Sequence, residues 1–211
     1  MNSHRFPFHY LRQVGPPYIA TARDWHRIVV KWCEFGPRVH DMYPYLLAEM
    51  FAYCLGAAHV KLPHQIAASF MVSDVGMGEK SEGWGYIDDM PNDKICGPHS
   101  PAELPHVIHF CQRYGLSDYF FGKRRLPGNF LSCESPLLAE PPMDIASKYK
   151  YANWPDGKRK EFSGKMAKRN AYMLCKLLPA INEAATYYKE RHCDTVKANF
   201  NKTLMFINIP Y

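Results

Sequence analysis

Residues 163–193, SGKMAKRNAYMLCKLLPAINEAATYYKERHC, form the longest regular segment of the chain. They predict a helix of about seven turns, the last large element of the fold. Ser163 is a candidate N-cap, because its hydroxyl can accept a hydrogen bond from an amide of the first turn. Pro179 lies inside the segment and predicts a kink, since proline lacks the amide hydrogen that a helix interior needs.

Two further helices are predicted near the N-terminus. The first spans residues 21–35, TARDWHRIVVKWCEF, with Thr21 as N-cap and Asp24 three residues on. The second begins near Pro44 and runs through residues 45–60, YLLAEMFAYCLGAAHV. One face of the first helix should hold Trp25, Ile28, Val29 and Trp32. The buried stripe of the second should hold Leu46, Met50, Tyr53, Cys54 and Ala57.

The middle of the chain changes character. Residues 73–105 are dense in Gly, Pro, Asp and Ser, which predicts a long ordered loop region, and loops of that length are usually functional. Short strands are predicted at HVIHFC (106–111), DYFFGK (118–123) and NFLSCES (129–135). Residues 134–160 are predicted to be irregular and end in the basic turn PDGKRK. The order predicts a helix-rich α/β fold with a few short strands, part of a larger α/β enzyme.

The composition favours a folded protein with an anionic partner. The chain has 211 residues, 47% of them hydrophobic, and a formal net charge of +6. Phosphate groups, nucleic acid and anionic lipid all fit that charge. Signatures of serine hydrolases, P-loop and dinucleotide-binding proteins and RNA-binding modules are missing, so nucleic acid is the least favoured partner. Neither a signal-peptide core nor a membrane-spanning stretch is expected in this chain.

The seven cysteines include no CxxC pair, which argues against a zinc ribbon. Their odd number leaves at least one thiol free. Cys96 and Cys133 flank the proposed site and are one candidate pair for an oxidising compartment, although spacing does not determine connectivity. Residues 201–203, Asn-Lys-Thr, form an N-glycosylation sequon, which matters only in a secretory compartment.

A histidine and a group of cations are the first candidate site. His109 ends the predicted strand HVIH, where an imidazole can be held rigidly as a metal ligand or hydrogen-bonded under a loop. Lys123 and Arg124 follow after the second short strand, and Arg113 is close to them in sequence. These cations either form a solvated surface run or hold a diphosphate beside a divalent metal.

Carboxylates give the second set of candidates. Asp88 and Asp89 are adjacent, and paired carboxylates suit Mg²⁺ or Mn²⁺, although aspartates in such turns more often cap their own backbone. Asp74, beside GMG, has the same two interpretations. Glu49 is expected at the edge of a buried helical stripe, where a carboxylate has to be paired or poised for chemistry.

Five blocks of the sequence carry a family resemblance. They are LLAEMFAYCLGAAHVKLPH (46–64), YIDDMP (86–91), HVIHFCQRY (106–114), FFGKRRLP (120–127) and CESPLLAEPP (133–142). Together they resemble the plant and algal hydroxyproline O-arabinosyltransferases and peptidyl serine α-galactosyltransferases, and they are closer to the serine branch. The resemblance spans residues 10–195 and corresponds to the C-terminal part of that family's catalytic domain.

The resemblance implies a GT-A glycosyltransferase with a Rossmann-like fold, a UDP-sugar donor, Mn²⁺ and a serine- or hydroxyproline-rich protein acceptor in the Golgi or endoplasmic reticulum. His109 matches the family's late metal ligand, and Lys123, with Arg124 and Arg113, matches the contact to the donor diphosphate. Glu49 matches the acidic residue near the acceptor and sugar. The reaction would retain the anomeric configuration, with the departing diphosphate taking the proton of the acceptor hydroxyl.

The resemblance also implies what residues 1–211 lack. The family's Asp-x-Asp metal motif and uridine pocket precede the matching region, so the chain is expected to be a partial glycosyltransferase domain without the donor-binding N-terminal part. The membrane anchor of the family also lies outside the matching segment. The alternative is a non-catalytic remnant that binds the acceptor peptide or a glycan.

Overall fold

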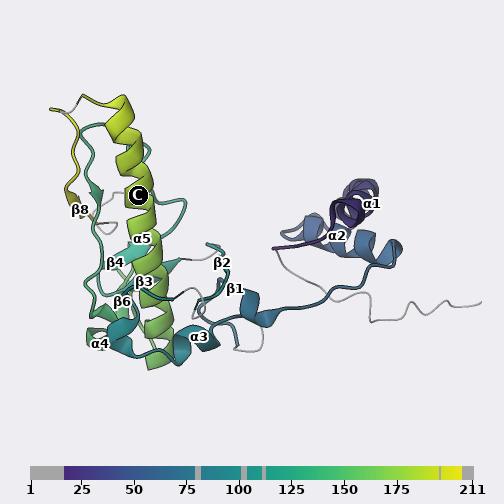
Figure 1. The fold of residues 1–211 in the computed structure, drawn as a ribbon, viewed down its shortest axis with the longest axis horizontal. Helices are drawn as coiled ribbons and strands as arrows, with labels where there is room; N and C mark the ends of the chain where they lie inside the picture. Colours follow the sequence, from purple (N-terminus) through teal and green to yellow (C-terminus); the bar gives the residue numbers. More distant parts are fainter. Residues whose placement is uncertain (1–16, 79–81, 101–103, 111–112, 195, 206–211) are drawn as a thin grey trace, which may run out of the picture. The chain divides into compact units, whose positions relative to one another are not determined.

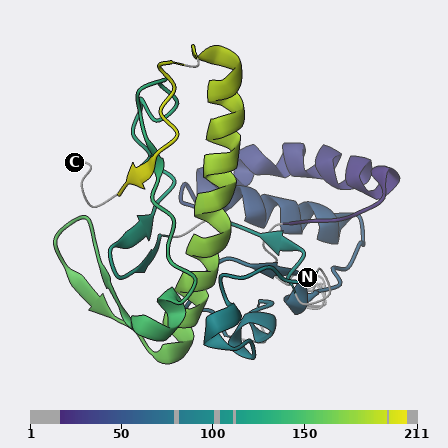
Figure 2. The same ribbon diagram turned by 60° about the vertical axis from the view of Figure 1, so that its left-hand side comes forward.

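The computed structural model describes residues 17–78, 82–100, 104–110, 113–194 and 196–205 (Figure 1). The chain divides into two compact units, Met1–Ala67 and Ala68–Tyr211. The described part of the first unit is a pair of helices. The second unit holds one long helix with short strands and irregular segments beside it (Figures 1 and 2).

The N-terminal unit consists of α1 (Ala22–Met42) and α2 (Ala48–His59). The predicted cap of α1 is confirmed, since the Thr21 hydroxyl accepts a hydrogen bond from the amide of Asp24 at 3.2 Å. Ile28 of α1 is buried in one cluster with Tyr53, Cys54 and Ala57 of α2. Gly56 lies at the closest approach of the two helices. A Cβ atom there would lie 3.2 Å from the carbonyl oxygen of Ile28, so a larger residue would push the helices apart.

Two of the predicted apolar positions in this unit are wrong. Val29 is 38% exposed, because it lies about one hundred degrees around the helix from the buried Ile28. Leu46 is 84% exposed, because α2 starts only at Ala48 and Leu47 adopts a left-handed conformation with φ 79°. Leu46 therefore belongs to the turn between the helices and not to the stripe of α2.

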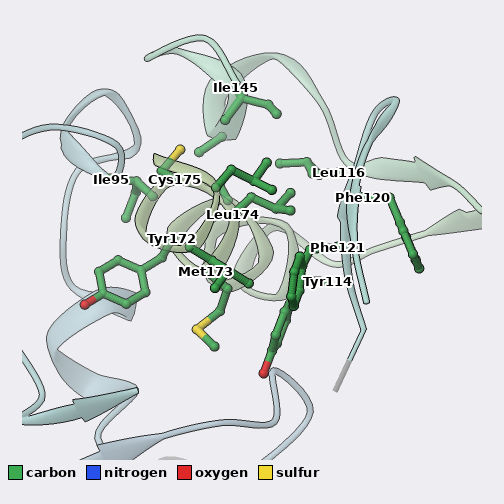
Figure 3. Packing of buried hydrophobic residues seen from close by; sticks show 14 of the residues in the cluster. Ile95, Tyr114, Leu116, Phe120, Phe121, Ile145, Tyr172, Met173, Leu174 and Cys175 are labelled. Atoms are coloured by element: carbon green, nitrogen blue, oxygen red, sulfur yellow. The ribbon is translucent and has the colours of Figure 1, made fainter. Parts of the chain in front are cut away.

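The centre of the C-terminal unit is α5 (Gly164–His192). Its predicted cap is also confirmed, since the Ser163 hydroxyl accepts a hydrogen bond from the amide of Met166 at 3.2 Å. Pro179 lies inside the helix, which continues on both sides of it to His192. Apolar side chains project from α5 on several sides and pack against residues of the loops and strands (Figure 3). Those labelled around it include Ile95, Tyr114, Leu116, Phe121 and Ile145.

The strands of the described residues form four small two-stranded sheets. The parallel pairs are β1 (Met71–Val72) with β2 (Val107–Ile108), and β5 (Leu137–Leu138) with β8 (Lys202–Leu204). The antiparallel pairs are β3 (Tyr114–Leu116) with β4 (Tyr119–Phe121), and β6 (Tyr151–Asn153) with β7 (Arg159–Glu161). The short helices are α3 (Gly85–Asp88), α4 (Ile145–Lys148), and the 3-10 turns η2 (Ala68–Phe70) and η3 (Asn92–Lys94).

These elements confirm a mixed α/β fold with few short strands, but they identify no GT-A fold. The predicted strand at 118–123 is confirmed as β4, and the strand at 106–111 is reduced to the two residues of β2. The strand predicted at 129–135 is wrong, because those residues form consecutive turns and the strand follows at β5. Residues 134–160 are less irregular than predicted, since they include β5, α4 and β6.

Two buried asparagines of α5 bind the main chain of neighbouring strands. The Asn170 side-chain oxygen accepts a hydrogen bond from the Gly115 amide of β3 at 3.0 Å. Asn182 accepts from the Leu138 amide of β5 at 2.9 Å and donates to its carbonyl oxygen at 2.8 Å. On the side of β3 and of β5 that faces α5, these side chains therefore provide the main-chain hydrogen bonds that a neighbouring strand would otherwise make.

Four basic residues of α5 donate hydrogen bonds to carbonyl oxygens of the irregular segments. The donors are Lys168 to Asp88 and Met90, Arg169 to Val75 and Met77, Lys176 to Gly97, and Lys189 to Ser135 and Asn199. Arg169 and Lys189 are buried. A buried carbonyl group without a partner costs about 1–3 kcal/mol, so these side chains decide where the loops can lie.

Two disulfides connect the same helix to the loops. Cys96 is bonded to Cys175 of α5, and Cys133 is bonded to Cys193, the residue after α5. The candidate pairing of Cys96 with Cys133 is therefore wrong. Cys96 has its partner on α5, and Cys133 has its partner directly after the end of that helix. Among the described cysteines, Cys33 and Cys54 are free, and Cys111 lies outside the described residues.

We expect peptide mapping of the unreduced protein to give Cys96–Cys175 and Cys133–Cys193 links. The bridges close loops with sequence separations of 79 and 60 residues. Loops of this length predict that replacing one pair by alanine lowers the free energy of unfolding by about 4 kcal/mol. Urea denaturation measures this loss, and Cys33→Ser is the matched control that should leave stability unchanged. Recovery of a Cys96–Cys133 peptide would contradict the assignment.

Candidate functional site

The ends of β1 and β2 bring His109 beside the start of the long loop. The two strands are parallel, with Met71 opposite Val107, and the amide of His109 donates to the carbonyl oxygen of Val72 at 2.9 Å. His109 and Ser73 therefore leave the sheet at the same edge. The carboxyl ends of parallel strands are where α/β proteins bind ligands. The strand that His109 was predicted to end stops one residue earlier, at Ile108, so His109 directly follows β2, and its side chain is partly exposed.

A buried carboxylate fixes the loop at this edge. Glu82 is 6% exposed and accepts hydrogen bonds from the amide and hydroxyl of Ser73, at 2.6 and 2.5 Å, and from the amide of Asp74 at 3.2 Å. The next residue, Gly83, donates to the carbonyl oxygen of Met71 at 2.7 Å. A Cβ atom on Gly83 would lie 2.6 Å from the Ser69 carbonyl oxygen, so only glycine fits there. Glu82 thus holds the first residues after β1 in one conformation.

The side chain of Asp74 caps the backbone of its own turn, which is one of the two roles predicted for it. Its Oδ1 atom accepts a hydrogen bond from the amide of Gly76 at 2.8 Å, which closes an Asx turn. Its carbonyl oxygen accepts a hydrogen bond from the indole of Trp84 at 2.9 Å. The carboxylate lies in the loop that leaves the sheet beside His109, and its role as a metal ligand stays a prediction.

Tyr114 connects the two strand ends to the hairpin that carries the cations. This buried residue is the first of β3, and its hydroxyl donates to the carbonyl oxygen of Ser73 at 2.8 Å and lies 3.4 Å from that of His109. In the β3–β4 hairpin, Tyr114 is opposite Phe121, so Arg113 and Gly122 flank the same end. The ring of Phe121 also lies 6.5 Å from that of Phe110. The hairpin end and the strand ends are therefore parts of one region.

The cations at this hairpin end are exposed. Arg113, Lys123 and Arg124 all face solvent, and the turn after β4 closes with a hydrogen bond from the Arg125 amide to the Gly122 carbonyl oxygen at 2.7 Å. Within the described residues, the side chains of Lys123 and Arg124 make no ion pair or hydrogen bond. Their charges are thus available to an anion.

Asp88 is taken up by an ion pair with α5. Its two carboxylate oxygens accept hydrogen bonds from Arg169 at 2.8 and 2.5 Å, both side chains are 4% exposed, and Lys165 lies 3.3 Å away. Burial of the carboxyl opposes ionisation, but the hydrogen bonds and charges of Arg169 and Lys165 outweigh it and hold the pKa of Asp88 below its ordinary value. Asp89 is exposed. Asp88 therefore anchors the loop, and the metal role of the pair stays a prediction.

Glu49 belongs to the N-terminal unit, whereas His109 and the cations belong to the C-terminal unit. Glu49 lies in the first turn of α2 and is exposed. The prediction that it lies at the edge of a buried stripe is therefore wrong. The buried residues of α2 include Ala48, the neighbour of Glu49, and, from Ala52 on, the side that packs against α1, whereas Glu49 faces solvent. A carboxylate in the first turn of a helix is favoured by the helix dipole.

The described residues do not form a complete metal site. His109 offers one imidazole, and no group of three or more His, Cys, Asp or Glu side chains arranged for a metal ion occurs in the described part of the chain. Manganese prefers about six ligands, mostly oxygen. A Mn²⁺ ion bound at His109 would need its other ligands from elsewhere.

Sequence reasoning missed Glu82 and Tyr114, which organise this region. Glu82 is one of two acids in the stretch EKSEGWG, and nothing in the local sequence marks it as buried. The only signal was the following Gly83, whose missing side chain allows the close contact with Ser69.

Comparisons of the chain with models of protein families, with curated proteins and with solved structures found no match.

Removing the carboxylate of Glu82 should loosen the start of the loop. Glu82→Leu leaves the buried amide of Ser73 and the partly buried amide of Asp74 without a partner, and we expect a loss of about 2–3 kcal/mol in the free energy of unfolding. Hydrogen exchange at Ser73 and Asp74 should accelerate at the same time. The control is Glu183→Leu, an exposed site on α5, which should leave this exchange unchanged. If the amides of Ser73 and Asp74 exchange as slowly in Glu82→Leu as in the wild type, the hydrogen bonds of Glu82 do not hold the loop.

Asp88 and its neighbour Asp89 provide a test of the ion pair with Arg169, with Asp89 as the control. Asp88→Asn leaves Arg169 buried without its counter-ion, and we expect a loss of about 3 kcal/mol. Asp89→Asn should change stability by less than about 0.5 kcal/mol. Equal effects in urea denaturation at neutral pH would refute the assignment.

The contribution of Asp88 should also depend on pH. Since the folded-state pKa is depressed, the stabilisation is fully present above the unfolded-state value of about 3.9 and is lost as the pH falls through the folded-state value. The difference between wild type and Asp88→Asn should therefore shrink only below about pH 4.

Proposed function

We propose that the chain is part of a glycosyltransferase that moves galactose or arabinose from a UDP-sugar to serine or hydroxyproline of a protein acceptor. The observation that supports it best is the arrangement around Tyr114. Its hydroxyl connects the ends of two parallel strands, where His109 lies, to the hairpin end that presents Arg113 and Lys123. A rigid strand-end edge beside unpaired cations suits the diphosphate of a nucleotide donor.

In this proposal the cations act on the leaving group. When the bond from the sugar to the nucleotide breaks, negative charge grows on the departing UDP, and Lys123, Arg124 and Arg113 stabilise that charge more than they stabilise the bound donor. The same diphosphate takes the proton of the acceptor hydroxyl, so that the sugar is transferred with retention. His109 would be one ligand of the family's Mn²⁺. Since the described residues offer no complete metal site, no step is assigned to a metal.

The acceptor side of the proposal rests on Glu49. This exposed carboxylate in the first turn of α2 would bind the acceptor peptide or the sugar near it. It belongs to the N-terminal unit, so a contribution to transfer needs both units in one active protein.

The two disulfides support the proposed compartment. Structural disulfides persist in the secretory pathway and are rare in the cytosol. The Golgi or endoplasmic reticulum, where such transferases would work, is oxidising enough for both bridges. Among the described residues, no helix is long and apolar enough to cross a membrane.

A non-catalytic peptide- or glycan-binding protein is the second candidate. The observation that favours it is that no group of three or more metal-type ligands, at His109 or elsewhere, occurs in the described chain. This candidate predicts binding of serine- or hydroxyproline-rich peptides without any response to UDP.

Calorimetric titration of UDP and of inorganic diphosphate into the full chain tests the anion site. We expect Lys123→Ala to weaken binding of both by about 10- to 100-fold, because a charge-assisted hydrogen bond contributes about 1.5–3 kcal/mol. The control is Lys158→Ala, in the exposed turn between β6 and β7, where the lysine is 83% exposed. It should change affinity less than twofold. Equal losses in the two variants would mean that only net charge attracts the anion.

The role of His109 and the reaction need two more measurements. Titration with and without Mn²⁺ should show a metal-dependent gain in UDP affinity that disappears in His109→Ala. Transfer from UDP-galactose or UDP-arabinose to a serine- and hydroxyproline-rich peptide then distinguishes the candidates. Peptide binding by folded protein with no UDP binding under either condition would overturn the transferase proposal and leave the binding protein.

A further inference from the structure

The sequon at residues 201–203 lies on the exposed strand β8. Asn201-Lys202-Thr203 is the only Asn-x-Ser/Thr triplet in the sequence. Asn201 directly precedes β8, and all three residues are exposed. A sequon that a fold buries cannot carry a glycan in the native protein, so this exposure meets the first requirement.

The main chain at the sequon is fully engaged while the side chain of Asn201 is free. The Asn201 carbonyl oxygen accepts a hydrogen bond from the Leu137 amide at 2.8 Å, and its amide donates to the Asn199 side chain at 3.0 Å. Within the described part of the chain, the carboxamide of Asn201 makes no hydrogen bond. A group attached to its nitrogen would therefore break no contact of the fold.

Asn201 does not belong to the groove beside the strand. Lys202 forms an ion pair with Glu140 at 2.7 Å and lines a groove along α5 with Glu183 and Tyr187. Asn201 and Thr203 are not among the residues that line this groove. A glycan at Asn201 would therefore be attached outside the groove lining.

The segment before the sequon is fixed by the second disulfide. The Asn199 amide donates to the carbonyl oxygen of Cys133 at 2.7 Å, and its side chain donates to that of Glu134 at 3.1 Å. Cys133 is bonded to Cys193, and Lys189 of α5 donates to the Asn199 carbonyl oxygen at 3.1 Å. The sequon and a disulfide thus belong to one local structure, which forms only in an oxidising compartment.

We propose that Asn201 carries an N-linked oligosaccharide. The donor class is an oligosaccharide joined through a diphosphate to a membrane lipid, and the reaction is catalysed by the host's transferase. The carboxamide nitrogen of Asn201 forms a bond to C1 of the first sugar, the bond from C1 to the diphosphate oxygen breaks, the lipid diphosphate leaves, and the nitrogen loses one proton to a base. This proposal does not depend on the glycosyltransferase proposal and shares with it only the oxidising compartment.

The test is to express the full chain through the secretory pathway of a eukaryotic cell. Wild type should carry one oligosaccharide that peptide N-glycosidase removes, with Asn201 converted to aspartate in the peptide map. Thr203→Val, which keeps the shape and strand preference of threonine, should lose the glycan, whereas Thr203→Ser should keep it. Asn201→Gln gives a second variant without the glycan.

The Cys133–Cys193 bridge reports whether each secreted variant is folded. Wild type that is secreted, disulfide-bonded and free of glycan would overturn the proposal. A glycan that persists in Thr203→Val and Asn201→Gln would also overturn it, because the attachment site would then lie elsewhere. Loss in both variants, with retention in Thr203→Ser, would establish the site.

Discussion

The C-terminal unit depends on hydrogen bonds from the side chains of α5 to the main chain of segments that have little regular structure. Irregular segments leave many amide and carbonyl groups without partners, and each buried one needs a hydrogen bond. Asn170 and Asn182 serve the strands, and Arg169 and Lys189 serve the loops. Apolar packing alone would hold these segments near α5, but the polar contacts determine which residue lies where along it.

Two sets of contacts connect the candidate site to α5 and determine its geometry. Arg169 donates to the carbonyl oxygens of Val75 and Met77, so the loop after β1 is tied to α5 while Glu82 fixes its first residues. Asn170 holds Gly115, the neighbour of Tyr114 in β3, and Tyr114 in turn contacts the two strand ends. The strand edge at His109 is therefore held in place by contacts that lead back to α5. A binding site needs such supporting contacts in order to keep its groups in position.

The sequence predicted those features whose causes are local. The caps at Thr21 and Ser163, the helix α5 and the strand end at His109 depend on residues a few positions apart. The contacts between distant segments could not be predicted, because many acids and cysteines of the chain were equally plausible partners. The carboxylates of Asp88 and Asp89 are adjacent in sequence, and only the position of Arg169, 81 residues from Asp88, separates a buried anchor from an exposed side chain. The partner of Cys96 on α5 depends on the same long-range packing.

The two basic runs of the C-terminal unit show why surface charge alone does not define a site. In the β6–β7 hairpin, Arg159 binds Glu161 at 2.7 Å and lies 3.6 Å from the ring centre of Tyr151, so its charge is already matched within the fold. Lys123 and Arg124 have no such partner among the described residues. They follow β4, whose last residue, Phe121, is paired with Tyr114 of β3, and the hydroxyl of Tyr114 lies 3.4 Å from the carbonyl oxygen of His109. An anion binds more tightly to cations that have no ion-pair partner and lie beside a rigid strand edge. No existing ion pair has to be broken, and no mobile loop has to be ordered, before the anion binds.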